Sequence, residues 1–370
     1  MKRIIILIAT MVMVLTSTVY AEKPLTAEDY DIKSQEYFQK GNYDKAIECI
    51  QKAIEINPVD ASLYTKLGWL YKEIGNTDKI IESYQKAIEI NPNDFLTYSN
   101  LGLLYKEIGN LDKALECFQA AADIDSTYAS TFVNIGSIYH DKGQDHKALN
   151  NFQKAIELDL SDELLYLKLG IVSESIGDHN KAIDTFKKVL ELNPKNYFAY
   201  YSLGYNYILL GSIDKGIEYI QKAKKINKTL EIEPVITNRL FELAIQYSKK
   251  GDYDKALQYY QFLISTDPNS VNLFYNMGLT YNNKGDQYKA IECYQKAIDI
   301  KPDFAGAYKM IGTSYHLQGM KNSSADYFYQ AGLLYLKQKN RQEVLGIIDI
   351  LELMEPNSEL SKKLKDKLYK

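Results

Sequence analysis

Glycine recurs along this chain at a fixed interval, and that interval constrains the fold more than any other feature of the sequence. Nine of the 20 glycines are spaced 34 residues apart, with one interval of 40: Gly41, Gly75, Gly109, Gly143, Gly177, Gly211, Gly251, Gly285 and Gly319. Seven others each precede a member of this series by seven residues: Gly68, Gly102, Gly136, Gly170, Gly204, Gly278 and Gly312. A period of this length indicates a solenoid or another stacked array.

One repeat, residues 61–94, reads ASLYTKLGWLYKEIGNTDKIIESYQKAIEINPND. Its first half places Tyr64, Leu67 and Tyr71 at helical spacing, which predicts a helix (helix A) with one apolar face. Gly75 then permits the left-handed conformation in which helices end. A second amphipathic helix (helix B) follows and stops at the Asn-Pro pair, because proline disfavours helix at the residue before it. A single pair cannot bury its apolar faces, so the repeats must stack.

This pattern resembles the tetratricopeptide repeat over nearly all of the chain after its first 21 residues. The family's aromatic residue near the start of helix A is found at Tyr30, Tyr64, Tyr98, Phe132, Tyr166, Tyr200, Phe274 and Tyr308. Its tyrosine in the last turn of helix A is found at Tyr37, Tyr71, Tyr105, Tyr139, Tyr207, Tyr247, Tyr281 and Tyr315. The resemblance implies an all-α fold, a right-handed α-solenoid (superhelix) of stacked antiparallel helix pairs.

The repeat pattern also divides the chain into segments. We expect a signal peptide at 1–21, repeats one to six within 22–230, an insertion at 231–236, repeats seven to nine with a partial tenth within 237–358, and a capping helix at 359–370. The insertion contains Pro234, which suits the first position of the next helix. We expect residues 227–236 to interrupt regular stacking and to be cut first in limited proteolysis. The lysine-rich last helix would supply the polar outer face that a terminal repeat needs.

The amino terminus carries the features of an export signal. Lys2 and Arg3 precede the uncharged apolar run 4–15, and a more polar segment ends at Ala21. This order is typical of a secretory signal peptide, here cleaved after Ala21. We therefore expect an exported protein of the bacterial periplasm or cell envelope. The alternative is a retained membrane anchor, since residues 4–21 reach the minimum length of a spanning helix.

Composition and motifs argue against several classes of function. The chain has 44 Lys and Arg against 48 Asp and Glu, a formal charge of −4, and its only arginines are Arg3, Arg239 and Arg341. Recognition of phosphates and bases relies on arginine and on a basic face, so we expect no nucleic-acid partner. The four histidines show no metal-ligand spacing, and no phosphate loop or nucleophile elbow occurs. The sequence therefore predicts no catalytic residue, metal, cofactor or small-molecule substrate.

The three cysteines share one helix B position. Cys49, Cys117 and Cys293 belong to repeats one, three and eight, none of which are adjacent. A disulfide needs Cα atoms within about 7 Å, so we expect three unpaired thiols.

The family resemblance implies that helix A lines an inner, concave groove and binds protein or peptide partners there. The groove positions of each repeat are 2, 5, 6, 9, 12 and 13. At these positions we select as peptide-binding residues Trp69, Asn100, Asn134, Leu167, Ile171, Phe198, Tyr201, Tyr205, Phe241, Tyr275 and Asn276. The family's clamp of Lys, Asn and Arg for a terminal carboxylate is absent, because Thr65, Trp69 and Ser130 occupy clamp positions around Asn100.

We expect a different role for each group of these residues. The asparagines would hold the backbone of an extended peptide, and otherwise form ordinary polar surface. Trp69 would project toward the groove, unless it packs on Lys72 or Leu103. The apolar residues of repeats five to eight would form a contiguous exposed patch, since other residues already fill their core positions, although superhelix curvature could bury part of it. Such patches mark interaction sites.

These observations together predict a non-enzymatic scaffold or adaptor that binds protein or peptide partners in its groove, in the cell envelope. The alternative is a membrane-tethered structural platform for an envelope complex, with residues 4–21 as its anchor.

Overall fold

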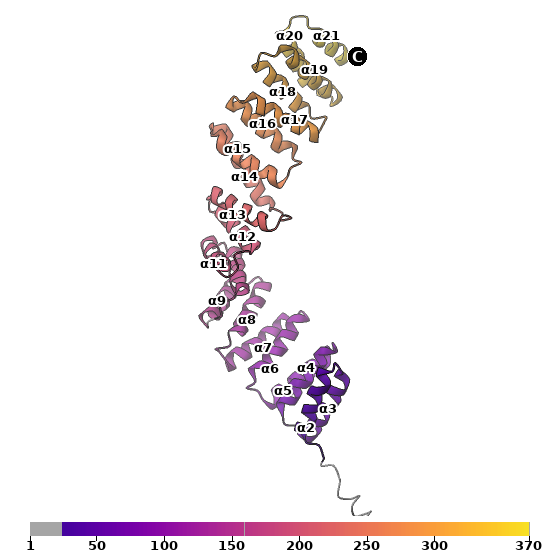
Figure 1. Ribbon diagram of the computed structural model, residues 1–370, viewed down its shortest axis with the longest axis vertical. Helices are drawn as coiled ribbons and strands as arrows, with labels where there is room; N and C mark the ends of the chain where they lie inside the picture. The colour runs from indigo at the N-terminus through magenta and orange to yellow at the C-terminus, as the bar shows by residue number, and fades with distance from the viewer. Residues whose placement is uncertain (1–23, 159, 370) are drawn as a thin grey trace, which may run out of the picture. The chain divides into compact units, whose positions relative to one another are not determined.

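The computed structural model describes residues 24–158 and 160–369, and all the regular elements in these ranges are α-helices (Figure 1). Their bounds are α2 Ala27–Gln39, α3 Tyr43–Ile56, α4 Ala61–Glu73, α5 Thr77–Ile90, α6 Phe95–Glu107, α7 Leu111–Ile124, α8 Ala129–Asp141, α9 Asp145–Glu157, α10 Glu163–Ser175, α11 His179–Leu192, α12 Tyr197–Leu209, α13 Ile213–Ile226, α14 Pro234–Lys250, α15 Tyr253–Thr266, α16 Val271–Lys284, α17 Gln287–Ile300, α18 Ala305–Leu317, α19 Lys321–Lys337, α20 Arg341–Met354 and α21 Glu359–Leu368.

The expected signal peptide, residues 1–21, lies outside the described residues. Within the described ranges, no helix combines the length and the apolar character that crossing a membrane requires.

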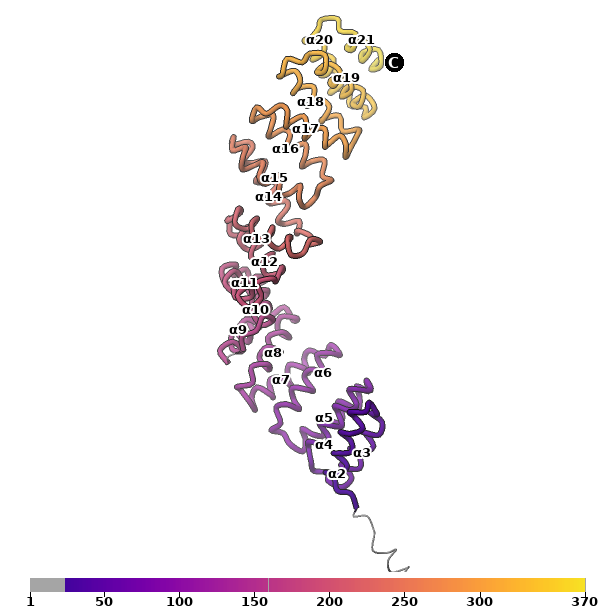
Figure 2. The backbone as a smooth tube through the Cα atoms, viewed as in Figure 1, coloured from indigo at the N-terminus to yellow at the C-terminus, as the bar shows by residue number. Residues whose placement is uncertain are grey.

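Helices pack in consecutive pairs, and successive pairs stack on one another. Even-numbered helices α2 to α10 and α14 to α18 each pack against the helix that follows, and α3, α5, α7, α9, α15, α17 and α19 each also pack against the first helix of the next pair. Figure 2 shows this alternation along the backbone. The predicted all-α solenoid of stacked helix pairs is confirmed.

The recurring hexapeptide YKEIGN closes one helix and starts the next. Gly75 has φ +71°, a left-handed conformation that favours glycine, and the N–H of Asn76 donates to the carbonyl of Tyr71 at 3.0 Å. The side chain of Asn76 then accepts from the N–H of Lys79, which caps α5. All nine glycines of the first series have positive φ. Each therefore ends a helix A, as the sequence predicts.

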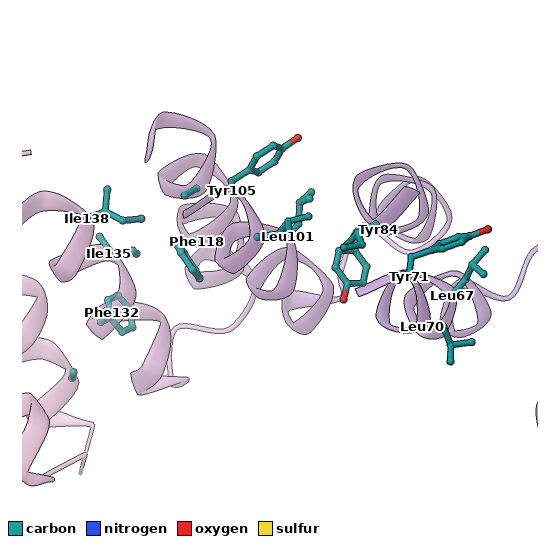
Figure 3. Packing of buried hydrophobic residues seen from close by; sticks show 14 of the residues in the cluster. Leu67, Leu70, Tyr71, Tyr84, Leu101, Tyr105, Phe118, Phe132, Ile135 and Ile138 are labelled. Carbon is teal, nitrogen blue, oxygen red and sulfur yellow. The ribbon is translucent and has the colours of Figure 1, made fainter. Parts of the chain in front are cut away.

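The second glycine series allows helix B to approach helix A closely. A Cβ on Gly68 would lie 2.6 Å from the ring of Tyr84, and one on Gly170 would lie 2.7 Å from the ring of Phe186. Both rings are almost completely buried. Figure 3 shows Tyr84 among the buried side chains of α4 to α8. A ring on helix B thus occupies the space that a side chain on helix A would need.

A lysine of helix B lies over the last-turn tyrosine of helix A in most repeats. The ammonium of Lys79 is 5.0 Å from the centre of the Tyr71 ring. The same pairing recurs as Lys45/Tyr37, Lys113/Tyr105, Lys147/Tyr139, Lys215/Tyr207, Lys255/Tyr247 and Lys289/Tyr281. Each cation–π contact stabilises by about 0.5–1 kcal/mol at an exposed site, so the repeated tyrosine joins the two helices of its pair at their turn.

The chain forms two compact parts, residues up to Ala199 (the N-terminal part) and residues from Tyr200 on (the C-terminal part). In the C-terminal part, α14 begins at Pro234, as predicted, and has 17 residues instead of the usual 13 or 14. The insertion therefore lengthens a helix A as well as a loop. Ile232 of the insertion and Leu230, which directly precedes the insertion, pack against a core cluster that contains Leu240.

The carboxyl end closes the stack as the sequence suggests. Helix α19 packs against α18 on one side and against α20 and α21 on the other, so it serves two neighbours. In α21, Leu364 is fully buried while Lys362, Lys363 and Lys367 are exposed.

Replacing Gly136 by alanine should lower the free energy of unfolding. The new Cβ would lie 2.7 Å from the ring of Phe152 and 3.2 Å from the carbonyl oxygen of Ala148, and overpacking of this kind costs about 1–3 kcal/mol. The midpoint of urea unfolding measures the loss.

Gly346 provides the matched control, because it is exposed within α20 and nothing lies within 4 Å of the Cβ it would gain. Gly346→Ala should raise stability by about 0.5–1 kcal/mol. Changes of the same sign in both variants would contradict the role given to the close contact.

Candidate functional site

Exposed apolar side chains gather on one face of the A helices in the N-terminal part. Six of them occupy positions 2 or 9 of their repeats: Trp69, Leu96, Leu103, Leu164, Ile171 and Phe198. These positions are seven residues apart, about two helical turns, so they lie on the same side of the helix. We call the surface formed by these six side chains and by the helix A residues between them the A face.

Trp69 lies at the edge of the A face that is nearest the amino terminus. Its side chain is 51% exposed, and its ring centre is 5.4 Å from that of Phe38 on α2. The tryptophan therefore packs on an aromatic residue of the preceding A helix, a partner that sequence reasoning did not consider. About half of the indole surface remains exposed.

The three predicted asparagines differ in what their amides do. Asn100 and Asn134 occupy position 6 of consecutive repeats and are half-buried. Neither amide forms a hydrogen bond with another residue of the described ranges. Asn276, at the same position of a later repeat, donates through Nδ2 to the carbonyl of Asn272 in its own helix at 2.8 Å. The N-terminal part thus presents two uncommitted amides, whereas the third is already engaged.

Tyr201 does not stay outside the core, so this part of the prediction is wrong. Its side chain is 8% exposed and packs in the cluster with Ile236 and Leu240. Its Oη accepts a hydrogen bond from the N–H of Glu233 at 3.1 Å. The physical reason is the insertion, which folds back over this ring and buries it.

The other predicted residues of the C-terminal part are half-buried. Tyr205 and Phe241 pack against the same cluster as Tyr201, and the ring of Tyr275 lies 5.0 Å from that of Phe304. In the N-terminal part, Leu167 is half-buried while Ile171 and Phe198 are exposed. The exposed apolar surface expected of repeats five to eight is therefore present on α10 and at the start of α12, and reduced in the C-terminal part.

Sequence reasoning missed Leu96 and Leu103, which are 49% and 43% exposed. Leu96 occupies the same repeat position as Leu164, and Leu103 occupies the same repeat position as Ile171. The signal was present in the sequence, and applying the same positions to repeat three would have found them.

A hydrogen-bonded cluster links three polar side chains beside the A face. Asp145 accepts from Nδ1 of His140 at 2.6 Å and from the hydroxyl of Ser175. Burial alone would raise the pKa of Asp145, but the hydrogen bonds from Ser175 and His140 hold that pKa below its ordinary value. Because the serine donates to the carboxylate and not to the imidazole, the cluster lacks the bond between nucleophile and base that activates a serine.

The cysteine thiols are free, and burial keeps them protonated. It raises the pKa of Cys117 to about 11 and that of Cys293 to about 12, and it also raises the pKa of Cys49. The thiolate is the reactive form, so these side chains act as core filling. Within the described residues, no three His, Cys, Asp or Glu side chains are grouped so that they could hold a metal ion.

Profiles of one protein family match more than half of the chain. Those described as TPR repeat match residues 35–75, 70–109 and 246–285, and those described as tetratricopeptide repeat match residues 93–161, 164–196, 199–230 and 271–304. No curated protein matches the chain.

Several solved structures are similar to parts of the chain. MamA is 30% identical over 44% of this chain and 95% of its own, with a TM-score of 0.42. YrrB, described as a TPR protein with an unusual peptide-binding site, is 26% identical over 61% of this chain and 96% of its own, with a TM-score of 0.33. The C-terminal part of a TPR repeat-containing protein from Cytophaga hutchinsonii is 18% identical over 75% of this chain and 98% of its own, with a TM-score of 0.47.

Tyr201→Phe should loosen the insertion without emptying the core. The variant keeps the buried ring but removes the acceptor of the Glu233 N–H, and loss of such a bond costs about 0.5–1.5 kcal/mol. We expect a lower urea midpoint and faster limited proteolysis within residues 227–236. Tyr288→Phe is the control, because Tyr288 is 75% exposed and should show neither effect. Unchanged proteolysis of Tyr201→Phe would show that this hydrogen bond does not hold the insertion.

Proposed function

The chain belongs to the tetratricopeptide repeat family, and on this premise we propose that it is a non-enzymatic scaffold that binds extended peptide segments of protein partners along the A face. One observation carries the proposal. Asn100 and Asn134 present uncommitted amides at the same position of consecutive repeats, and Asn100 lies between the exposed Leu96 and Leu103 at positions 2 and 9 of its repeat.

The chemistry of these groups fits a peptide main chain. An asparagine amide carries a donor and an acceptor, so one side chain can pair with the C=O and the N–H of one extended peptide. Hydrogen bonds to the main chain favour an extended conformation, and contacts with alternate side chains supply specificity. Trp69, Leu103 and Ile171 would supply those contacts, because aromatic and apolar anchors dominate binding energy at such surfaces.

Three groups that could begin a reaction are engaged in structural roles. Burial keeps the thiols of Cys117 and Cys293 protonated, and the hydroxyl of Ser175 donates to Asp145. These observations support a binding role for the surface over a catalytic one.

We also propose export to the bacterial cell envelope, on the evidence of residues 1–21 alone. The alternative function, a membrane-tethered platform for an envelope complex, would keep the same residues as an anchor. Intact mass spectrometry of the protein isolated from its native envelope distinguishes the two. We expect a chain that begins at Glu22, whereas a mass that includes Met1 to Ala21 would support the platform.

The peptide-binding proposal is tested by selecting peptides from a displayed random library on the wild-type protein. Binding is then followed by the fluorescence of Trp69, the only tryptophan in the chain. Asn100→Ala combined with Asn134→Ala should weaken the selected peptides by tenfold or more, since two hydrogen bonds of about 1 kcal/mol each are lost.

Asn276→Ala is the matched control, because that amide already bonds its own helix, and it should leave the affinity unchanged. A library that returns no binder, or binders indifferent to the loss of both amides, would refute the proposed site.

A further inference from the structure

A small recess opens between three A helices of the N-terminal part. It has a volume of about 150 Å³ and is lined by Lys106 of α6, by Ser137, His140 and Asp141 of α8, by Lys168 and Ile171 of α10, and by Phe152 of α9. The exposed Ile171 belongs to the A face, so the recess opens beside the surface proposed to bind peptides. The ring of Phe152 is buried and gives the recess an apolar wall.

Two lysine side chains lie in this recess without a partner. Lys106 and Lys168 are both half-buried, and neither ammonium forms a hydrogen bond or an ion pair within the described part of the chain. Burial and the positive charge of Lys106 lower the pKa of Lys168, and Asp141 opposes this only in part. Two cations are thus held close together in a place where water solvates them incompletely.

A lysine at the same repeat position as Lys168 has a partner in another repeat. Lys66 is the equivalent of Lys168 in repeat two, and it forms an ion pair with Asp31 of the preceding A helix. The residue equivalent to Asp31 in the repeat before Lys168 is Val133, which cannot accept a hydrogen bond. The lysine in repeat two is therefore paired with a carboxylate, whereas Asp141, which also lines the recess, forms no ion pair with Lys106 or Lys168 among the described residues.

We propose that this recess binds a carboxylate of the peptide on the A face, so that partners carry an acidic group next to apolar residues. This inference rests on the proposed function and names the chemistry of its ligand. A carboxylate can accept hydrogen bonds from both ammonium groups, and it adds a second negative charge to that of Asp141 opposite the two lysines. The recess holds about five times the roughly 30 Å³ of one water molecule, enough for a carboxylate and its adjoining carbons. The carboxylate belongs either to an Asp or Glu side chain or to the end of the peptide chain.

The experiment uses the full chain and three fluorescent peptides that share one sequence except at the central residue and at the chain end. The first has a central Glu flanked by leucines and blocked ends, the second has Gln in its place, and the third has Gln and a free terminal carboxylate. We expect the Glu peptide to bind at least tenfold more tightly than the blocked Gln peptide at low salt. Salt should reduce this difference, because screening weakens exposed charge pairs. Tight binding of the third peptide would identify a chain terminus as a second source of the carboxylate.

Substitutions of the two lysines then test whether the recess causes the tighter binding of the Glu peptide. Lys106→Met and Lys168→Met should each reduce the preference for Glu, and the double variant should abolish it. Methionine keeps an unbranched apolar stem, and Lys168→Met should melt at or above the temperature of the parent because it removes a half-buried charge. Lys168→Gln serves as a second neutral variant. Lys86→Met is the control, since Lys86 is exposed on helix B and pairs with Glu89.

The outcomes separate the two proposals. Equal binding of the Glu and Gln peptides, or a preference that survives loss of both lysines, overturns the carboxylate recess and leaves peptide binding in place. Failure of all three peptides to bind overturns the recess and counts against peptide binding on the A face as well.

Discussion

Close contact between a glycine of helix A and a ring of helix B is the interaction on which the rest of this structure depends. In six repeats a Tyr or Phe of helix B occupies the space above that glycine, as Phe118 does above Gly102 and Phe328 above Gly312. Repeat six uses Ile220 against Gly204. Because packing density in cores leaves little free volume, this contact fixes how the two helices of each of these seven repeats sit against each other. The opposite side of helix A takes no part in it, and the A face can therefore differ from one repeat to the next.

Function in a repeat protein follows from these differences. Lys66 and Lys168 share a repeat position, yet one is neutralised by Asp31 and the other has no partner among the described residues. Asn134 and Asn276 also share a position, yet only Asn276 donates to its own helix. A buried or half-buried polar group without a partner is costly unless a ligand supplies one. The exceptions to the repeat therefore carry more information about binding than the repeat itself.

The insertion shows how a short segment can change the surroundings of a residue at a recurring repeat position. It adds length to α14 and brings the N–H of Glu233 to the hydroxyl of Tyr201. Position 5, which is half-buried in most repeats, carries a large core side chain in this one. The segment also lines an open recess of about 750 Å³ in the C-terminal part, together with Phe241 and Asn272, so it changes the shape of the surface around it.

The sequence by itself determined the helices, their turns and the order of the repeats. Gly75, Asn76 and Pro234 act on their immediate neighbours through backbone conformation and capping, and such local effects can be read along the chain. It also predicted that Trp69, Asn100 and Asn134 lie on one side of helix A, because helical periodicity alone places residues on a face. Only the tertiary structure decided that Tyr201 is buried, that Trp69 packs on Phe38, and that Lys106 and Lys168 share one recess. These contacts join different repeats, and they depend on the stagger between stacked helices and on the path of the insertion, which a spacing of 34 residues does not specify.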